Sequence, residues 1–313
     1  MHDEHFVTKG DSYMLDVNLL GTGGMVPLPG RYLTSLAVRY AGETMIVDCG
    51  EGTQMAAREA GISLGKIGVI CITHFHADHI AGLPGLLLTI GNAERTEPLT
   101  IIGPKHIGHV ADCLRIIAPQ LPYEIKYVET DGGQVYKLDS LIISAQAVKH
   151  RIPCFAYKFQ LSRAGKFNAQ KASEREIPVR YWSLLQRGQT VELDGQILDP
   201  SQFTGAPRRG LKICYATDLR PSQALVDFAR DADLFICEGM YGDPELQSKA
   251  RERYHSVFSE AAAMAKQADV RELWLTHFSP SMPKPQEYLH IAREIFSNTH
   301  IDKKSAQLRF EDK

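Results

Sequence analysis

The segment Thr73–His79, T-H-F-H-A-D-H, places four potential metal ligands within six residues. Imidazole nitrogens and carboxylate oxygens are ligands that zinc and similar divalent ions accept. His74 and His76 alternate along an extended segment, so both can reach one ion, and Asp78 and His79 lie just beyond them, within reach of a second ion. The alternative interpretation is a polar loop with histidines by chance. We favour a metal loop because of the sequence around the motif.

That surrounding sequence predicts that the motif follows a buried strand. Residues 67–73 form an apolar, β-rich run of strand length, and residues 80–88 indicate a turn that leads into a helix. Open α/β sheets bind their ligands at the carboxyl ends of strands. The motif therefore occupies the kind of loop in which functional sites are found.

Three more potential ligands, His150, Asp218 and His277, each follow or end an apolar, β-rich run. In a layered α/β architecture such strand ends gather at one edge. The candidate ligands are then seven in number: His74, His76, Asp78, His79, His150, Asp218 and His277. Seven are too many for one tetrahedral zinc ion, so we predict two ions. Three histidines would hold one ion, two histidines and Asp78 would hold the other, and Asp218 would bridge them.

Such a centre has a definite chemistry. Open coordination positions would hold a shared water, which makes the site catalytic rather than structural. A bridging hydroxide between two divalent ions is a nucleophile at neutral pH, and the same ions can clamp the oxygens of a phosphodiester during in-line attack. The residues therefore predict a metal-dependent hydrolase, with Zn²⁺ as the metal and Mn²⁺ as the alternative.

Three residues outside the seven candidate ligands, Asp48, Glu238 and His255, have two interpretations each. Asp48 is either an ordinary turn residue or an acceptor that orients a metal-bound histidine. Glu238 closes an apolar strand, and His255 falls within residues 244–267, which we predict to be largely helical. These two are either structural or a carboxylate–imidazole pair, in which the histidine meets the phosphate or protonates the leaving oxygen.

The glycines of Gly21–Gly24 predict a tight turn after the first strand. They could also cradle a phosphate. The segment has no G-K-[ST] and no full G-x-G-x-x-G, which argues against a nucleotide-binding loop.

Length, charge and composition limit the number of domains and exclude some classes of protein. The 313 residues suffice for one large domain or two modest ones, and the net charge of −2 excludes a chain that binds nucleic acid indiscriminately. Residues 1–12 are a polar lead without a secretory pattern, and no apolar run approaches the roughly 18 residues of a membrane span. We therefore expect a cytoplasmic protein without a membrane partner. The six scattered cysteines favour reduced thiols.

Residues 158–212 differ from the rest of the chain in charge. They contain ten basic and five acidic residues, a net charge of +5, so the remainder carries −7. This segment is either an ordinary solvated insertion or a basic arm that holds a polyanion such as RNA, because Lys and Arg supply most non-specific affinity for nucleic acid.

The motifs together resemble the metallo-β-lactamase superfamily and, within it, the ribonuclease Z family of tRNA 3′-processing endonucleases. The resemblance extends from about Met14 to His277. The matching segments are Leu20–Gly24, Asp48–Glu51, Thr73–His79 with Gly82–Leu87, Ile102–Pro104, His150, Thr217–Asp218, Glu238, His255–Ser256 and Thr276–His277.

This resemblance implies a fold, a reaction and an assembly. The fold would be a single α/β domain over residues 1–313, a four-layer αββα sandwich with residues 158–212 as an inserted basic arm. The reaction would be cleavage of the 3′ trailer of precursor tRNA by a bridging hydroxide on two zinc ions. Asp78, Glu238 and His255 would be the catalytic residues, and the protein would be a homodimer. A phosphodiesterase for small phosphodiesters or cyclic nucleotides is the alternative on the same site.

The substrate-recognition segments depart from the family pattern. The P-x-K-x-R-N loop appears as residues 27–32, P-L-P-G-R-Y, which has the arginine but neither the lysine nor the asparagine. The arm lacks the Gly-Pro-rich tip of the family. The predicted RNA contacts are Arg31, Arg180, Arg208 and Arg209.

Two other classes of protein are consistent with the metal ligands alone. A lactone or thioester hydrolase needs an acyl pocket, and the basic arm argues against it. A zinc-binding scaffold without activity is disfavoured by the complete ligand set.

Overall fold

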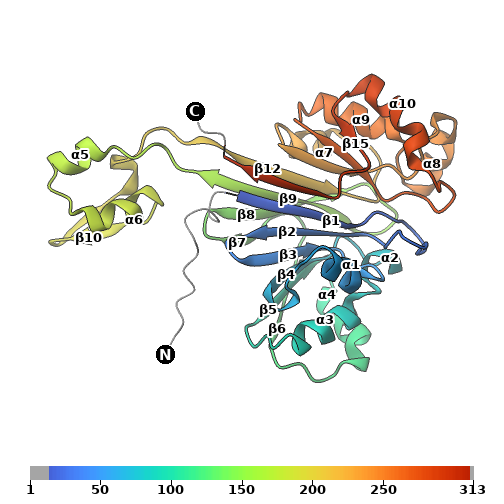
Figure 1. Ribbon diagram of the computed structural model, residues 1–313, viewed down its shortest axis with the longest axis horizontal. Coiled ribbons are helices and arrows are strands. Elements are labelled where there is room, and N and C mark those ends of the chain that lie inside the picture. The colour runs from blue at the N-terminus through green and yellow to red at the C-terminus, as the bar shows by residue number, and fades with distance from the viewer. Residues whose placement is uncertain (1–13, 311–313) are drawn as a thin grey trace.

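The computed structural model describes residues 14–310, so the predicted polar lead, residues 1–12, lies outside the described residues. Two sheets pack face to face, helices cover their outer faces, and a small lobe projects from one end of the molecule (Figure 1). This helix–sheet–sheet–helix arrangement confirms the predicted α/β fold class. None of the helices in the described range is long and apolar enough to cross a membrane.

The first sheet contains seven strands and is built mainly from the N-terminal half of the chain, with one strand from the C-terminus at its edge. In spatial order they are β16 (Ser305–Arg309), β1 (Met14–Gly21), β2 (Ser35–Tyr40), β3 (Glu43–Val47), β4 (Ile67–Cys71), β5 (Leu99–Gly103) and β6 (Ile125–Glu129).

The second sheet also contains seven strands, all from the later part of the chain. In spatial order they are β15 (Thr299–His300), β14 (Leu273–Thr276), β13 (Leu234–Glu238), β12 (Arg208–Ala216), β9 (Cys154–Arg163), β8 (Leu141–Val148) and β7 (Gly133–Leu138).

Alternating side chains let a single strand pack against the other sheet on one face and against the helices on the other. On β13, Leu234 and Ile236 enter the core between the two sheets, whereas Phe235 and Cys237 face the helices outside. Successive side chains on a strand point to opposite faces, so a strand buried on both faces reads as a continuous apolar run. This is why L-F-I-C-E carries no polar residue before its last position.

Each sheet has its own covering helices, and a separate apolar cluster lies beneath each set. The helices over the first sheet are α1 (Thr53–Glu59), α3 (Leu83–Asn92) and α4 (Ile107–Leu114), and those over the second are α7 (Gln223–Ala229), α9 (Phe258–Gln267) and α10 (Leu289–Ile295). All six cysteines are free thiols, and five of them are buried, in agreement with the prediction of reduced cysteines.

Parallel pairing determines where the functional side chains meet. In the first sheet β3, β4, β5 and β6 are parallel neighbours, and in the second β12, β13 and β14 are. Carboxyl ends of parallel strands lie at one edge of a sheet. The loops after β3, β4, β12 and β14 therefore leave the sandwich on the same side.

The lobe is an excursion between two strands that remain paired. Strands β9 and β12 are antiparallel, with Arg163 opposite Arg208, and residues 164–207 form the lobe beyond them. The predicted arm boundaries, 158 and 212, fall within these two strands. The lobe contains α5 (Ala169–Glu174), α6 (Trp182–Gln186), β10 (Val191–Leu193) and β11 (Gln196–Leu198), which enclose a small apolar core of their own.

The connection to the lobe is narrow. A Cβ atom on Gly165 would lie 1.9 Å from the carbonyl oxygen of Gly205, so the two chain segments can approach this closely only with glycine at residue 165. Figure 1 places the lobe at the left of the view and α2 (Ala77–Ile80), which carries Asp78 and His79, at the right.

Candidate active site

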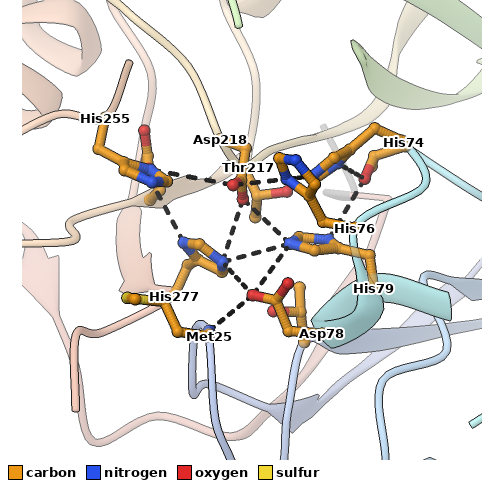
Figure 2. Close-up of polar contacts among 12 residues, drawn as sticks. Met25, His74, His76, Asp78, His79, Thr217, Asp218, His255 and His277 are labelled. Atoms are coloured by element: carbon orange, nitrogen blue, oxygen red, sulfur yellow. Dashed lines mark hydrogen bonds and ion pairs between the residues drawn. The ribbon is translucent and has the colours of Figure 1, made fainter. Parts of the chain in front are cut away.

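The seven predicted metal ligands converge at the edge where the parallel strands end. Figure 2 labels six of them, all but His150. The seven form two groups of ligand atoms, and a third group joins Asp218 and His277 to Glu238 and His255. In each group the nitrogen and oxygen atoms lie within 4.8 Å of one another.

The first group consists of His74, His76, His150 and Asp218. Nδ1 of His76 lies 2.9 Å from Nε2 of His74 and 3.3 Å from Nε2 of His150. Ligands bound about 2.1 Å from a tetrahedral zinc ion lie about 3.4 Å from each other. The spacing of this group is therefore that of ligands around a single ion.

The second group consists of Asp78, His79 and His277. Nε2 of His277 lies 3.2 Å from Nε2 of His79 and 3.3 Å from Oδ2 of Asp78. Two imidazole nitrogens and one carboxylate oxygen face one point, as the sequence predicted for the second ion.

Asp218 lies between the two groups. Its Oδ1 is 3.0 Å from Nε2 of both His79 and His277, and its Oδ2 is 3.7 Å from Nε2 of both His74 and His150. The side chain is buried, and Oδ1 makes no hydrogen bond of acceptable geometry. A buried carboxylate oxygen without a hydrogen bond is costly. Oδ1 therefore needs positive charge beside it, which either a metal ion or the protonated imidazoles of His79 and His277 can supply.

The electrostatics of the site also favour cations. Burial disfavours the charged form of His79 and His277, but the neighbouring carboxylates together outweigh burial: Asp218 and Asp48 for His79, and Asp218, Asp78 and Glu238 for His277. The pKa of His79 is raised well above its usual value and that of His277 is raised to about 10. Burial, together with the charge of His79, lowers the pKa of His74 well below its usual value. In the metal-free protein, protonated His79 and His277 supply the positive charge that the buried carboxylates require.

Asp48 is both a turn residue and an orienting acceptor, so its two interpretations are compatible. Its φ angle is +60°, and its Oδ2 lies 2.7 Å from Nδ1 of His79. The backbone N–H of Thr73 donates to Oδ1 at 2.8 Å. An acceptor on Nδ1 fixes the imidazole so that Nε2 points into the metal group.

Glu238 and His255 form the predicted pair at the rim of the site. Nδ1 of His255 lies 3.0 Å from Oε2 of Glu238, while Oε1 accepts from the backbone N–H groups of Leu219 and Ser256. Burial raises the pKa of Glu238, but the charge of His255 and the hydrogen bonds from His255 and His277 together outweigh it, so the pKa is lowered. The His255 ring centroid is 5.7 Å from those of His150 and His277.

The prediction of a largely helical segment at 244–267 is wrong at His255. Helix α8 (Gln247–Arg253) ends before it, and α9 begins only at Phe258. Tyr254 has a φ angle of +61° and ends the first helix. Glu260 accepts from the backbone N–H of Val257, which stabilises the start of the second helix. His255 is thus on a loop rather than on a helical surface.

Two residues that contact the ligands were missed by sequence reasoning. A Cβ atom on Gly24 would lie 2.9 Å from the His277 ring, and the backbone N–H of Met25 donates to Oδ2 of Asp78 at 2.6 Å. Paired glycines after a strand can mark a close approach of the backbone to another group. The G-T-G-G turn carried that signal, but nothing in the sequence indicated which side chain approaches it.

The four predicted RNA contacts occupy different environments. The guanidinium of Arg31 donates to the carbonyls of Met282 and Pro283, which links two loops beside the site. Arg208 and Arg209 lie at the start of β12, where Arg208 donates to the Ala164 carbonyl and Arg209 pairs with Asp233 at 2.8 Å. Arg180 is exposed on the lobe, against the Tyr181 ring.

Comparison with known proteins gives one family model and many relatives. The model described as anti-Pycsar protein Apyc1 matches residues 15–114. Ribonuclease Z of Agathobacter rectalis is 51% identical over 302 residues, which cover 96% of this chain and 100% of that protein. Ribonuclease Z of Lachnoclostridium phytofermentans is 49% identical over 95% of this chain and 99% of its own.

Solved structures resemble the fold across the same length. The short form of human tRNase Z superimposes with a TM-score of 0.66 at 23% identity, covering 95% of this chain and 100% of the other. The metallo-β-lactamase fold protein YhfI from Bacillus subtilis gives a TM-score of 0.67 at 18% identity, with the same coverage of each chain. These two structures support the metallo-β-lactamase fold.

Proposed function

The chain belongs to the ribonuclease Z family, and from that premise we propose that it removes the 3′ trailer of precursor tRNA at a centre of two zinc ions. Membership makes it a metal-dependent hydrolase of the metallo-β-lactamase fold. The observation that best supports the two-metal centre is the position of Asp218, with one oxygen facing each ligand group.

The ligand sets support zinc as the resident metal. His74, His76 and His150 supply three nitrogens on one side, and His79, His277 and Asp78 supply two nitrogens and one oxygen on the other. Such nitrogen-rich sets suit Zn²⁺ better than Mg²⁺ or Ca²⁺, which prefer oxygen, whereas Mn²⁺ tolerates both. When bound, two such ions activate water and neutralise the charge of the phosphodiester that is attacked.

Side chains of the protein would carry out the proton transfers. Asp78, an ionised carboxylate of the second ligand group, can accept a proton from the attacking water. His255, held through Nδ1 by Glu238, can donate a proton from its other ring nitrogen to the leaving 3′ oxygen. The bond between phosphorus and that oxygen breaks as water bonds to phosphorus. The tRNA keeps a 3′-hydroxyl and the trailer keeps the phosphate.

We infer that the lobe supplies affinity for the body of the tRNA. It projects far from α2 in Figure 1 and exposes Arg180 together with the apolar side chains of Val179 and Ile197. Its distance from the ligands suits it to contact a part of the RNA remote from the cut. Phosphate contacts of this kind would make binding strongly dependent on salt.

We also propose that two chains associate as a homodimer. Adjacent isoleucines in η3 (Arg115–Ile117) are highly exposed, Ile116 at 73% and Ile117 at 75%, and Leu88 on α3 is exposed nearby. An apolar cluster in contact with water favours burial against a second copy. Sedimentation of the wild type should give a dimer, and Ile117→Lys should shift it toward the monomer. A wild type that sediments only as a monomer would refute this assembly.

Cleavage of a precursor tRNA with a labelled trailer tests the proposed reaction. The zinc-loaded wild type should release the trailer and leave a 3′-hydroxyl on the tRNA. Asp78→Ala should be slower by a factor of at least about 10², and exposed Asp302→Ala should match the wild type. Intact precursor after incubation with either Zn²⁺ or Mn²⁺ would exclude the proposed substrate.

A small-phosphodiester hydrolase on the same centre is the second candidate. It would use the same ligands, four of which, His74, His76, Asp78 and His79, lie within the segment that matches the anti-Pycsar model. This candidate expects cyclic nucleotides to be turned over faster than precursor tRNA, with or without the lobe. The proposed ribonuclease expects the opposite order for the intact chain.

A further inference from the structure

A partly buried arginine joins three of the loops that form the active site. Arg220 lies two residues after Asp218, and its side chain is 12% exposed. Its backbone N–H donates to the carbonyl of Lys149, the residue before His150, at 2.9 Å. Its guanidinium points toward the loop that carries His255 and donates to the backbone carbonyl of His255.

The same guanidinium is anchored on a partly buried carboxylate. Both terminal nitrogens of Arg220 donate to Glu260, with Nη1 at 2.9 Å from Oε2. Glu260 also accepts from the side chain of Gln247 on α8 at 3.0 Å and from the backbone N–H of Val257 at 3.1 Å. The planar fork of arginine matches a carboxylate with two parallel bonds and still has donors for a third acceptor. A lysine cannot reproduce this geometry.

The backbone N–H of His255 donates to the carbonyl of Ala250 on α8 at 2.8 Å, and its carbonyl is the group that Arg220 binds. The loop that carries His255 is not helical, and it begins at Tyr254 with a left-handed backbone. Glu238 holds the side chain of His255 and the N–H of Ser256, but it does not contact the His255 carbonyl. The imidazole is therefore held by Glu238. The backbone that carries it is held at its N–H by Ala250 and at its carbonyl by Arg220, which Glu260 anchors.

We propose that Arg220 is a positioning residue for the reaction, which fixes the backbone of His255 so that its imidazole can protonate the leaving oxygen. This inference rests on the proposed function. Arg220 acts on the backbone, not on a metal ligand side chain, so its effect is expected on the proton-transfer step and not on metal content.

The test compares two leaving groups. Arg220→Gln removes the fork, and a displacement of about 1 Å in a catalytic group can cost a factor of about 10². We expect kcat for precursor tRNA to fall about 10- to 100-fold, with KM changed less than about twofold. Turnover of bis(p-nitrophenyl) phosphate should stay within about twofold, because p-nitrophenolate leaves without needing a proton. For precursor tRNA, the kcat of Arg220→Lys should fall between those of the wild type and Arg220→Gln.

A double-mutant cycle separates positioning from general structural damage. In the His255→Ala background, Arg220→Gln should change kcat for tRNA by less than about twofold, because the group it positions is absent. Exposed Arg230, which pairs with Asp227, provides the control Arg230→Gln, and the wild-type rate is expected for it. If Arg220→Gln fails to fold, Glu260→Gln removes the same anchor and enters the same cycle.

Three results would overturn the inference: equal losses with both substrates, equal losses with and without His255, or loss of bound metal in the variant. They differ from failure of the proposed function. In that case the wild type itself would cleave bis(p-nitrophenyl) phosphate but not precursor tRNA.

Discussion

At the scale of single residues, Asp218 lies between the two groups of candidate metal ligands. One carboxylate faces imidazoles from both ends of the chain, and burial removes the solvent that would otherwise compensate its charge. The seven ligand candidates could be predicted because each closes an apolar strand or follows one closely. Their grouping around two ions also agrees with the geometry. That they bind metal remains a prediction.

Metal binding should release protons. In the metal-free protein the pKa of His79 is raised and that of His277 is raised to about 10, so both are protonated at neutral pH. Coordination requires neutral imidazole, and we expect about two protons per chain to leave on zinc binding at pH 7. Calorimetry in buffers of different ionisation enthalpy measures this number. Zinc binding with no release would contradict the charge assignment.

The same shifts predict how the stability of the metal-free protein depends on pH. A histidine whose folded pKa lies above its usual value of 6.5 stabilises the fold fully below that value. That stabilisation is lost as pH rises toward about 10, the folded pKa of His277. The unfolding midpoint of the metal-free protein should therefore fall between these pH values. The zinc-loaded protein should change less, because its imidazoles are already neutral.

Gly24 tests how closely the backbone approaches a ligand. In Gly24→Ala the new methyl group would meet the His277 ring at 2.9 Å, a distance that real Cβ atoms do not tolerate. The ring must move, so we expect weaker metal binding by a factor of about 10 or more. Gly205→Ala on the lobe, whose nearest neighbour would be 3.7 Å away, is the control. Unchanged zinc affinity in Gly24→Ala would show that the ring adjusts without cost.

At the scale of elements, the sequence predicts strands better than it predicts the loops between them. Strands β2 and β3 form a hairpin around Ala41-Gly42, and both its alternation and its turn residues are local signals in the sequence. The loop at His255 was missed because helix-forming residues flank it on both sides. The loop is held by Glu238 and by the Arg220–Glu260 pair, and Glu238 and Arg220 come from other parts of the chain.

Removal of the lobe should separate binding from chemistry. Because β9 and β12 stay paired up to Arg163 and Arg208, a short turn can replace residues 165–206. The lobe has its own core, so we expect the sandwich to fold without it. KM for precursor tRNA should rise about tenfold or more, with turnover of bis(p-nitrophenyl) phosphate unchanged within about twofold. An unchanged KM for tRNA would exclude the lobe from RNA binding.

At the scale of the whole molecule, the fold class and the family could be predicted because the metal motif and the strand pattern agree. The substrate is less directly encoded. Three of the four predicted RNA contacts, Arg31, Arg208 and Arg209, make internal contacts in this structure. Charge along the sequence indicated a basic segment, but it could not distinguish exposed cations from those paired within the fold. The cytoplasmic location likewise stays a prediction.

Stepwise metal loading with tRNA cleavage as the readout tests the central claim most directly. The metal-free chain receives Zn²⁺ in fractions of one equivalent, and release of the trailer from precursor tRNA is measured after each addition. A centre that needs both ions predicts little cleavage up to about one equivalent and a rise that saturates at about two per chain. Full activity at one equivalent, or no cleavage at two, would contradict a two-metal ribonuclease.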